Sequence, residues 1–306
     1  MKTTITAAAS IFALSIVGVG VSSTALNGNI VEKNAAEHAQ NPFASALIDL
    51  DGDGLEELIK VHARKNKGEE RISVRDPNTN IKSSRIEMDL AEHWGQGAYP
   101  TSVAGGNIDD DSNTELAISR KNSVNMRVAL YDFESFRGRG SRTSGRMKLV
   151  QEFGRDWGRK YFSRQASFGD LDGDGRDELI IVSNAPDRLY NADPNPKRPG
   201  PIMVFARHGK SKTFQPAYHV DGYFKGFKVG HVAIRDMNKD GKMDILVTEL
   251  ETKGTKEPRY KIFAPAQAPK VSVMSRLKLV SQGKKKFPIN FFNPISQTQI
   301  ASAKIK

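Results

Sequence analysis

The sequence of 306 residues contains no cysteine. This absence excludes a disulfide framework, zinc sites with thiolate ligands and cysteine nucleophiles. The sequence also lacks the His-Glu-x-x-His, Gly-x-Ser-x-Gly and glycine-rich phosphate-binding motifs, which mark common catalytic centres. The histidines, at positions 38, 62, 93, 208, 219 and 231, are scattered without metal-ligand or proton-relay spacing. The sequence therefore favours a protein that is not an enzyme.

Long apolar runs are also scarce, and the one that exists lies at the N-terminus. Lys2 precedes an apolar stretch over residues 5–21, and Ser-Thr-Ala at 23–25 resembles a small-x-small cleavage site. This pattern predicts a cleavable signal peptide over residues 1–25 and a secreted or periplasmic protein. The alternative is an uncleaved membrane anchor, but the run is short and lacks a basic stop-transfer flank. No transmembrane segment is expected after signal cleavage.

One pattern recurs four times along the rest of the chain. It consists of an apolar stretch, an acidic loop of nine residues and a second apolar stretch. The loops cover residues 49–57, 107–115, 170–178 and 236–244, and their first residues are 58, 63 and 66 positions apart. The flanking runs are short and rich in β-branched residues, which predicts strands. With the alternating segments between the loops, each repeat holds three or four strands, the content of one propeller blade.

The third copy, FGDLDGDGRDELII at residues 168–181, carries the pattern most fully. It resembles the FG-GAP (also called VCBS) repeat family, the calcium-binding blades of integrin alpha-chain propellers and of many secreted bacterial proteins. The resemblance covers roughly residues 42–265 and implies an all-β fold, a β-propeller with four recognisable blades or five. The expected organisation is a signal peptide (1–25), an N-terminal linker (26–41), propeller repeats (42–284, with blades near 42–98, 99–160, 161–226 and 227–284) and a C-terminal segment (285–306) that could supply a closing strand.

The number of blades leaves two arrangements open. Integrin propellers have seven blades, which at the spacing seen here would need roughly 420 residues. Four blades are enough for a small closed propeller. The alternative is an open array that completes itself with another chain. Closure is favoured, because an exposed open edge promotes aggregation.

The acidic loops have the ligand chemistry of calcium, which takes six to eight oxygen ligands. Side-chain oxygens at positions 1, 3 and 5 can point at one centre, position 7 can add a main-chain carbonyl, and an acid at position 9 can close the shell. Glycine at position 6 permits the tight turn. The predicted Ca²⁺ ligands are Asp49, Asp51, Asp53, Leu55 and Glu57 in the first loop, Asn107, Asp109, Asp111, Asn113 and Glu115 in the second, Asp170, Asp172, Asp174, Arg176 and Glu178 in the third, and Asp236, Asn238, Asp240, Lys242 and Asp244 in the fourth.

Two alternatives bear on these loops. An EF-hand needs a glutamate at position 12 and flanking helices, whereas position 12 is occupied here by Lys60, Ile118, Ile181 and Val247. The second loop is the weakest, because Asn107 replaces a carboxylate and Ser112 replaces the glycine. It is either a weaker calcium site or a solvated turn.

The charge of the chain is unevenly distributed. The formal net charge is +11, yet the four loops hold 17 of the 35 acidic residues, so the rest of the chain carries a net charge of +25. Basic clusters occur at Arg137, Arg139, Arg142, Arg146 and Lys148, at Lys197 and Arg198, and at Lys284, Lys285 and Lys286. Once calcium neutralises the loops, such a surface attracts anionic polymers.

Two classes of function follow. The first is a binding or adhesion module whose partner is a protein, an anionic glycan or an anionic cell surface, with no specific nucleic-acid motif. The second is a secreted polysaccharide lyase or hydrolase, whose active site would lie in the longest insertions, near residues 134–160 and 184–200. Trp94 and Trp157 could stack on sugars, although tryptophan in a β protein is more often part of the core.

Overall fold

The computed structural model describes residues 45–63, 70–76, 86–89, 99–109, 113–121, 128–137, 144–155, 157, 161–185, 200–207, 213–220, 224–251, 257–266 and 274–287. These residues form sixteen strands and no helix, so the fold is all-β as expected. No described segment is a helix that could span a membrane. The predicted signal peptide, the linker at 26–41 and the C-terminal segment after Phe287 lie outside the described residues.

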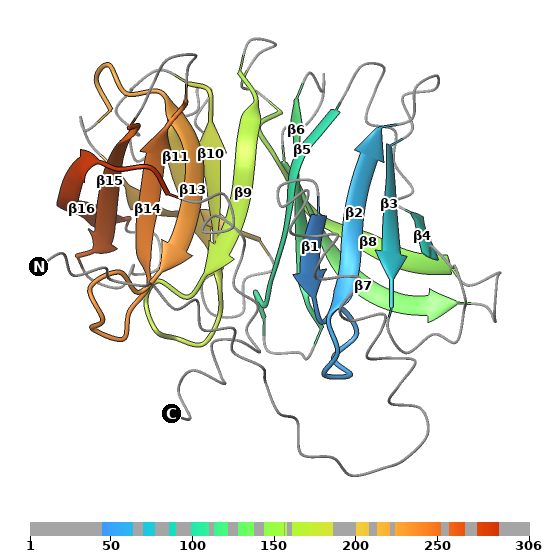
Figure 1. The fold of residues 1–306 in the computed structure, drawn as a ribbon. Coiled ribbons are helices and arrows are strands. Elements are labelled where there is room, and N and C mark those ends of the chain that lie inside the picture. Colours follow the sequence, from blue (N-terminus) through green and yellow to red (C-terminus); the bar gives the residue numbers. More distant parts are fainter. Residues whose placement is uncertain are drawn as a thin grey trace, which may run out of the picture.

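The strands fall into four antiparallel units of four consecutive strands each (Figure 1). Unit 1 contains β1 (Ser45–Ile48), β2 (Glu57–Ala63), β3 (Glu70–Arg75) and β4 (Ile86–Asp89). Unit 2 contains β5 (Tyr99–Gly106), β6 (Glu115–Lys121), β7 (Val128–Arg137) and β8 (Ser144–Phe153). Unit 3 contains β9 (Ser163–Gly169), β10 (Glu178–Ser183), β11 (Ile202–Ala206) and β12 (Gln215–His219). Unit 4 contains β13 (Val229–Arg235), β14 (Asp244–Glu249), β15 (Arg259–Pro265) and β16 (Ser275–Lys284).

The last strands of neighbouring units pair in parallel and join the units two by two. Glu87 of β4 lies opposite Ser144 of β8, and Tyr218 of β12 lies opposite Ser275 of β16. The result is two eight-stranded sheets, in the orders β1-β2-β3-β4-β8-β7-β6-β5 and β13-β14-β15-β16-β12-β11-β10-β9. Units 1 and 2 thus form an N-terminal half, and units 3 and 4 form a C-terminal half.

Three hydrophobic cores lie between successive units, because the strands of units 2 and 3 are covered by a neighbouring unit on both faces. β10 shows the reason: all six of its residues are buried. Its side chains alternate between the two faces, so Leu179 and Ile181 pack in the core shared with unit 2, and Ile180 and Val182 in the core shared with unit 4. This explains why the strand is a continuous apolar run rather than an alternating one.

The structure leaves the number of propeller blades unconfirmed. Each unit has the strand content of one blade, and the first strands β1, β5, β9 and β13 contact one another in that order. Among the described residues, however, no hydrophobic cluster joins unit 4 to unit 1. Ring closure and the predicted blade boundaries therefore stay predictions.

The expected insertion at 134–160 is mostly strand. β7 and β8 are ten residues each and pair over almost their whole length, from Val128–Phe153 to Arg137–Ser144. Trp157, which follows this hairpin, is 5 % exposed and belongs to the core between units 2 and 3. Its predicted core role is confirmed.

Candidate metal-binding loops

The four acidic loops occupy equivalent places in the four units. Each one connects the first strand of its unit to the second, after β1, β5, β9 and β13. The apolar strands on either side are anchored in the cores, so the loop ends are fixed while the loop itself faces solvent. In the third loop, for example, Leu171 and Glu178 are buried, whereas Gly173, Asp174 and Gly175 are exposed.

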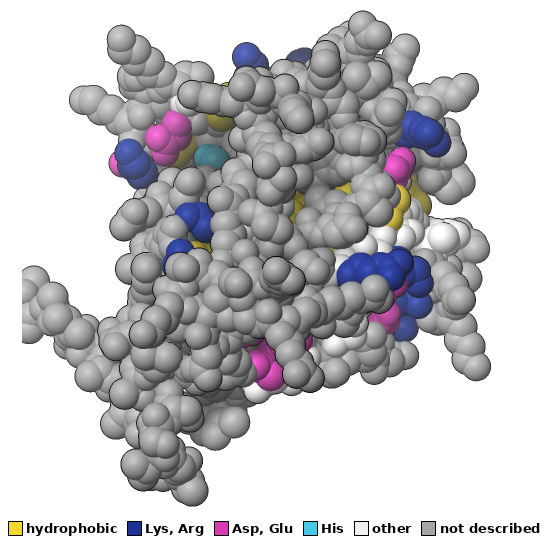
Figure 2. Space-filling model, turned by 90° about the vertical axis from the view of Figure 1, so that its right-hand side faces the viewer, with side chains coloured by type: hydrophobic (Ala, Val, Ile, Leu, Met, Phe, Trp, Pro, Cys, Tyr) yellow, Lys and Arg dark blue, Asp and Glu magenta, His cyan; other side chains and the backbone are white. Residues whose placement is uncertain are grey.

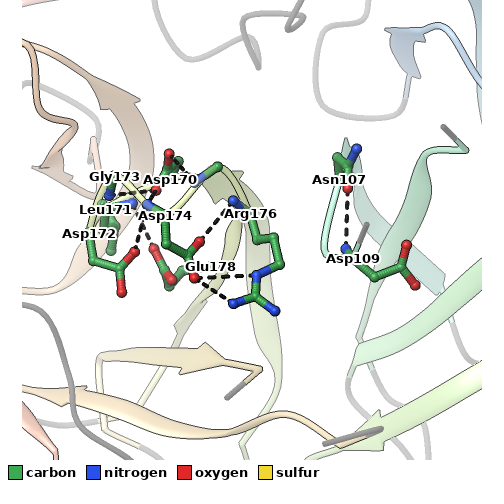
Figure 3. Close-up of polar contacts among 10 residues, drawn as sticks. Asn107, Asp109, Asp170, Leu171, Asp172, Gly173, Asp174, Arg176 and Glu178 are labelled. Atoms are coloured by element: carbon green, nitrogen blue, oxygen red, sulfur yellow. Dashed lines mark hydrogen bonds and ion pairs between the residues drawn. The ribbon is translucent and has the colours of Figure 1, made fainter. Parts of the chain in front are cut away.

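The carboxylate at position 1 organises each well-formed loop by accepting main-chain N–H groups. In the third loop, Asp170 accepts hydrogen bonds from the N–H groups of Gly173 (2.7 Å), Asp174 (3.1 Å) and Gly175 (3.0 Å), as Figure 3 shows in part. Asp172 accepts a further bond from Asp174 N–H at 3.1 Å. Carboxylate oxygens of Asp170 and Asp172 thereby lie together with one of Glu178, whereas Asp174 forms an ion pair with Arg176 at 2.8 Å.

The same arrangement recurs in the first and fourth loops. Asp49 accepts hydrogen bonds from Gly52 and Gly54, and Asp236 from Asp240 and Gly241, all within 3.1 Å. The glycine at position 6 has a positive φ in each loop, 88° at Gly54, 90° at Gly175 and 85° at Gly241, as the sequence predicts.

Position 4 has a similar conformation, which was not predicted from the sequence. Gly52, Gly173 and Lys239 occupy this position, with φ of 76°, 81° and 62°. Lys239 is the one residue other than glycine with positive φ among the described residues. The glycine at position 4 of the first and third loops was the available signal.

The acid at position 9 closes each loop from inside the protein. Glu57, Glu115, Glu178 and Asp244 are at most 3 % exposed. Each accepts a hydrogen bond from the main-chain N–H at position 2; the pairs are Glu57–Leu50 (2.7 Å), Glu115–Ile108 (3.0 Å), Glu178–Leu171 (2.6 Å) and Asp244–Met237 (3.1 Å). One carboxylate oxygen of each of these acids thus holds the loop to the end of the first strand.

The first and third loops fit a calcium ion. Carboxylate oxygens of Asp49, Asp51 and Asp53 lie within 4.8 Å of one another, and so do those of Asp170, Asp172 and Glu178. Ligands at calcium's usual bond length of about 2.3–2.6 Å lie at most about 5 Å apart. In the first loop, Oε1 of Glu57 is also buried without a hydrogen-bond partner among the described atoms. A buried carboxylate oxygen of this kind is costly unless a cation or donor meets it.

The fourth loop keeps the hydrogen bonds but has fewer carboxylates. Asn238 stands at position 3 and donates its side-chain N–H to Asp240 at 3.0 Å. The three acids of this loop do not form a group as compact as those of the first and third loops. Its predicted ligands therefore lie in one loop, but in a looser arrangement.

The second loop is built differently, because a cation from unit 3 meets it. The guanidinium of Arg207, which follows β11, forms an ion pair with Asp109 at 3.0 Å. Asn107 N–H donates to the Asp177 carboxylate at 2.9 Å, and Asp177 N–H donates to the Asn107 carbonyl at 2.7 Å. Figure 3 shows Asn107 and Asp109 next to the third loop. This loop joins units 2 and 3 through residues that the sequence analysis did not connect; its predicted ligand Asp111 lies outside the described residues.

Burial and mutual repulsion raise the pKa values of the inward-facing acids. Burial is the largest cause for Glu57 and Glu178, whose pKa values rise to about 9, and nearby aspartates of the same loops add to the shift. The pKa of Asp51 rises to about 6 through burial and the charge of Asp53. The pKa of Asp172 is likewise raised by burial and by the charge of a neighbouring aspartate. Without a cation, these carboxyl groups therefore stay protonated at pH values at which ordinary carboxyl groups are ionised.

These shifts predict that the metal-free protein loses stability as the pH rises. Between about pH 4.5 and 9 the folded state binds more protons at Glu57 and Glu178 than the unfolded state does, so the free energy of unfolding falls with increasing pH. Each group contributes up to about 1.4 kcal/mol per pH unit. Urea unfolding in chelator at about pH 5.5 and about pH 8 measures the change. Glu57→Gln removes one titrating group and should roughly halve the slope; an unchanged or rising stability would contradict the assignment.

The fold and the loops define an all-β repeat protein with aspartate-rich loops between the first two strands of each repeat. Residues 170–247, from the third loop to β14, match the family model described as an FG-GAP-like repeat. This match confirms the resemblance to the FG-GAP-like repeat family over these residues, which hold the third and fourth acidic loops. A search of curated proteins found no match.

Proposed function

We propose that this chain is an exported, calcium-stabilised binding module that uses a four-bladed propeller to bind an anionic extracellular polymer. The observation that carries the proposal is the repeated acidic loop, in which half-buried aspartates share a loop with a buried acid at position 9. A repeat of the FG-GAP-like family is itself suggestive of an interaction or adhesion module.

The calcium ions would act as scaffold elements. The position 9 acid begins the second strand of each unit and holds the main chain at position 2, just after the first strand. A cation bound between the position 9 acid and the aspartates of the loop would fix both strands relative to the loop. It would also supply the charge that repelling carboxylates need in order to ionise together. The proposed ions belong in the first, third and fourth loops; in the second, Arg207 already supplies positive charge.

The proposed partner is anionic because the chain carries a net charge of +11, and calcium bound to the acidic loops would make it more positive still. Outside the four loops, the chain carries a net charge of +25. On the face shown in Figure 2, the described Lys and Arg side chains lie in several separate groups, some of them next to Asp or Glu. Arg146 of the predicted basic cluster is paired with Glu134 at 2.9 Å. The side chains of Arg137, Arg139, Arg142, Lys197 and Arg198 lie outside the described residues.

The decisive experiment compares retention with turnover. We expect the full-length mature protein to be retained on an acidic polysaccharide such as polygalacturonate in calcium buffer, and to be released by salt. We expect no new reducing ends and no unsaturated products after long incubation. Products would support the alternative of a polysaccharide lyase or hydrolase, and absence of retention on anionic polymers would contradict the proposed partner.

A further inference from the structure

A buried tyrosine hydroxyl lies in the core behind the third acidic loop. Tyr218 of β12 is 1 % exposed and belongs to the core between units 3 and 4, together with Leu171 of the loop and Ile180 of β10. Its hydroxyl has no hydrogen-bond partner among the described atoms. A buried hydroxyl without a partner is costly, and such groups commonly mark a functional contact, an ion or an ordered water.

The strand register places Tyr218 on the same sheet face as Glu178, the acid at position 9 of the third loop. Ile180 lies opposite Val204, and Val204 lies opposite Tyr218. Directly opposed residues share a face, and so do residues two apart on one strand, such as Glu178 and Ile180. Tyr218 and Glu178 therefore lie on one face, two strands apart.

The strand between these two residues leaves space for the tyrosine ring. Ala206 stands beside Glu178 on β11, one position beyond the paired Leu179 and Phe205. Ala206 is 3 % exposed and packs in the same core as Tyr218. Because the side chain of alanine ends at Cβ, the ring of Tyr218 can extend over it toward Glu178.

The charges of the third loop act on the hydroxyl of Tyr218. Its pKa is raised by burial first, and then by the negative charges of four acids, of which Glu178 has the largest effect and Asp172, Asp170 and Asp174 follow. All four acids belong to the third loop. A phenol in such a negative potential keeps its proton, so the hydroxyl is a hydrogen-bond donor toward the loop.

The other units have no counterpart of this tyrosine. The same register, followed from the residue two after the position 9 acid to the last strand of each unit, ends at Ile86, Gln151 and Ser281 in units 1, 2 and 4. Among these three, Ser281 alone has a hydroxyl, and it is exposed. In unit 1, the place of Ala206 is taken by Asp76, whose charge adds to burial in raising the pKa of Glu57.

An ion in the third loop would create the need for a donor at this place. Glu178 would then be an ionised carboxylate that is 3 % exposed, and one of its oxygens accepts the N–H of Leu171 at 2.6 Å. Carboxylates that bind metal ions are themselves held by hydrogen bonds, and a buried charge is costly without them. The hydroxyl of Tyr218 can supply such a bond from the same sheet face.

We infer that Tyr218 is a positioning residue of the third loop, whose hydroxyl donates a hydrogen bond to the carboxylate of Glu178 when that carboxylate holds a calcium ion. The inference rests on the proposed function, from which it takes the ion. It extends the site from the first two strands of unit 3 to its last strand. Because Tyr218 lies opposite Ser275 where β12 pairs with β16, the ion would also be tied to the seam between units 3 and 4.

The test uses Tyr218→Phe, which removes the hydroxyl and keeps the ring, in the mature full-length protein. Calcium should bind the third loop of this variant about tenfold more weakly, as is usual when a partner of a metal ligand is lost. Denaturant unfolding should then show a calcium-induced gain that is smaller by up to about 1.4 kcal/mol. In chelator, the variant should be as stable as the unchanged protein or more so, because the hydroxyl that it lacks has no described partner.

Two control variants separate this effect from a general loss of packing. Tyr131→Phe removes a buried hydroxyl of unit 2 that accepts a hydrogen bond from Arg120 at 2.7 Å. It should lower stability by similar amounts in calcium and in chelator. Asp170→Asn weakens the third loop itself, so Tyr218→Phe added to it should cause little further loss of the calcium effect, because two changes at one site are not additive.

The other outcomes overturn distinct statements. A loss of stability in Tyr218→Phe that is equal in calcium and in chelator would make the hydroxyl a structural group without a part in ion binding. A calcium effect as large as that of the unchanged protein would show that the hydroxyl does not reach the loop. If calcium does not stabilise the unchanged protein, the calcium scaffold of the proposed function fails and the contact fails with it.

Discussion

Addition of calcium should raise the free energy of unfolding by about 4–8 kcal/mol, and chelation should remove this gain. Calcium sites of extracellular modules have Kd values of about 10⁻⁴ to 10⁻³ M. At about 10 mM calcium, each such site stabilises the folded state by about 1.4–2.7 kcal/mol. The first, third and fourth loops provide three sites, and their contributions add because the loops lie in different units. Denaturant unfolding with and without chelator measures the sum.

The choice of controls makes this result specific. Magnesium demands smaller, near-octahedral coordination, so the same concentration of magnesium should give a much smaller gain. Asp170→Asn removes a carboxylate from the third loop. Its one amide oxygen can still accept the N–H of Gly173, whereas the acceptor of the Gly175 N–H is lost. It should lose about one third of the calcium effect. If chelation leaves stability unchanged, the calcium scaffold is wrong.

Gly106→Ala should destabilise the protein by about 3 kcal/mol, because units 2 and 3 approach each other too closely there for a side chain. A Cβ on Gly106 would lie 2.4 Å from Cβ of Phe168 and 2.8 Å from a carboxylate oxygen of Asp177. Overpacking of this kind costs about 1–3 kcal/mol. Moving Asp177 would also weaken its hydrogen bond with Asn107, which is worth about 1 kcal/mol. Equilibrium unfolding in calcium buffer measures the loss.

The neighbouring residue supplies the matched control. Gly105→Ala adds the same methyl group one position earlier, where it would meet the side chain of Ile48 at 2.5 Å in the contact between units 1 and 2. The nearest atom there is the terminal Cδ1, with Cγ1 and Cγ2 at 2.9 Å, and all three move when the Ile48 side chain rotates, whereas Cβ of Phe168 is fixed to its strand. We expect a cost of about 1 kcal/mol. Equal losses for the two variants would argue against a rigid contact at Gly106.

The sequence was sufficient to predict the parts of the fold that repeat locally. The glycines of the loop at 170–178 predict a tight turn, because a positive φ favours glycine. The apolar run that follows the loop predicts a strand that is buried on both faces. The third strands of the units, such as β11 and β15, were likewise visible as alternating segments between the loops. The buried acid at position 9 was predicted as a ligand, and its burial gives that prediction a physical basis.

Features that depend on contacts between units could not be predicted in this way. Arg207 and Asp109 are 98 residues apart, and nothing in either local sequence indicates that they meet. The last strands of the units were also missed, since an outer strand such as β16 alternates buried and exposed residues only in its first half. β8 starts in a Ser-, Gly- and Arg-rich stretch, and its pairing with β7 rather than its composition makes it a strand.

The parallel pairs that join the last strands of neighbouring units have a consequence for how the chain folds. Glu87 pairs with Ser144, and Tyr218 pairs with Ser275, so each half of the molecule is closed by a contact spanning 57 residues. No strand of one half pairs with a described strand of the other. Each half can therefore complete its own hydrogen-bonded ladder before the two meet, and local opening should follow the same division. In kinetic terms, we expect the seam between β5 and β9 to form last and to part first under load.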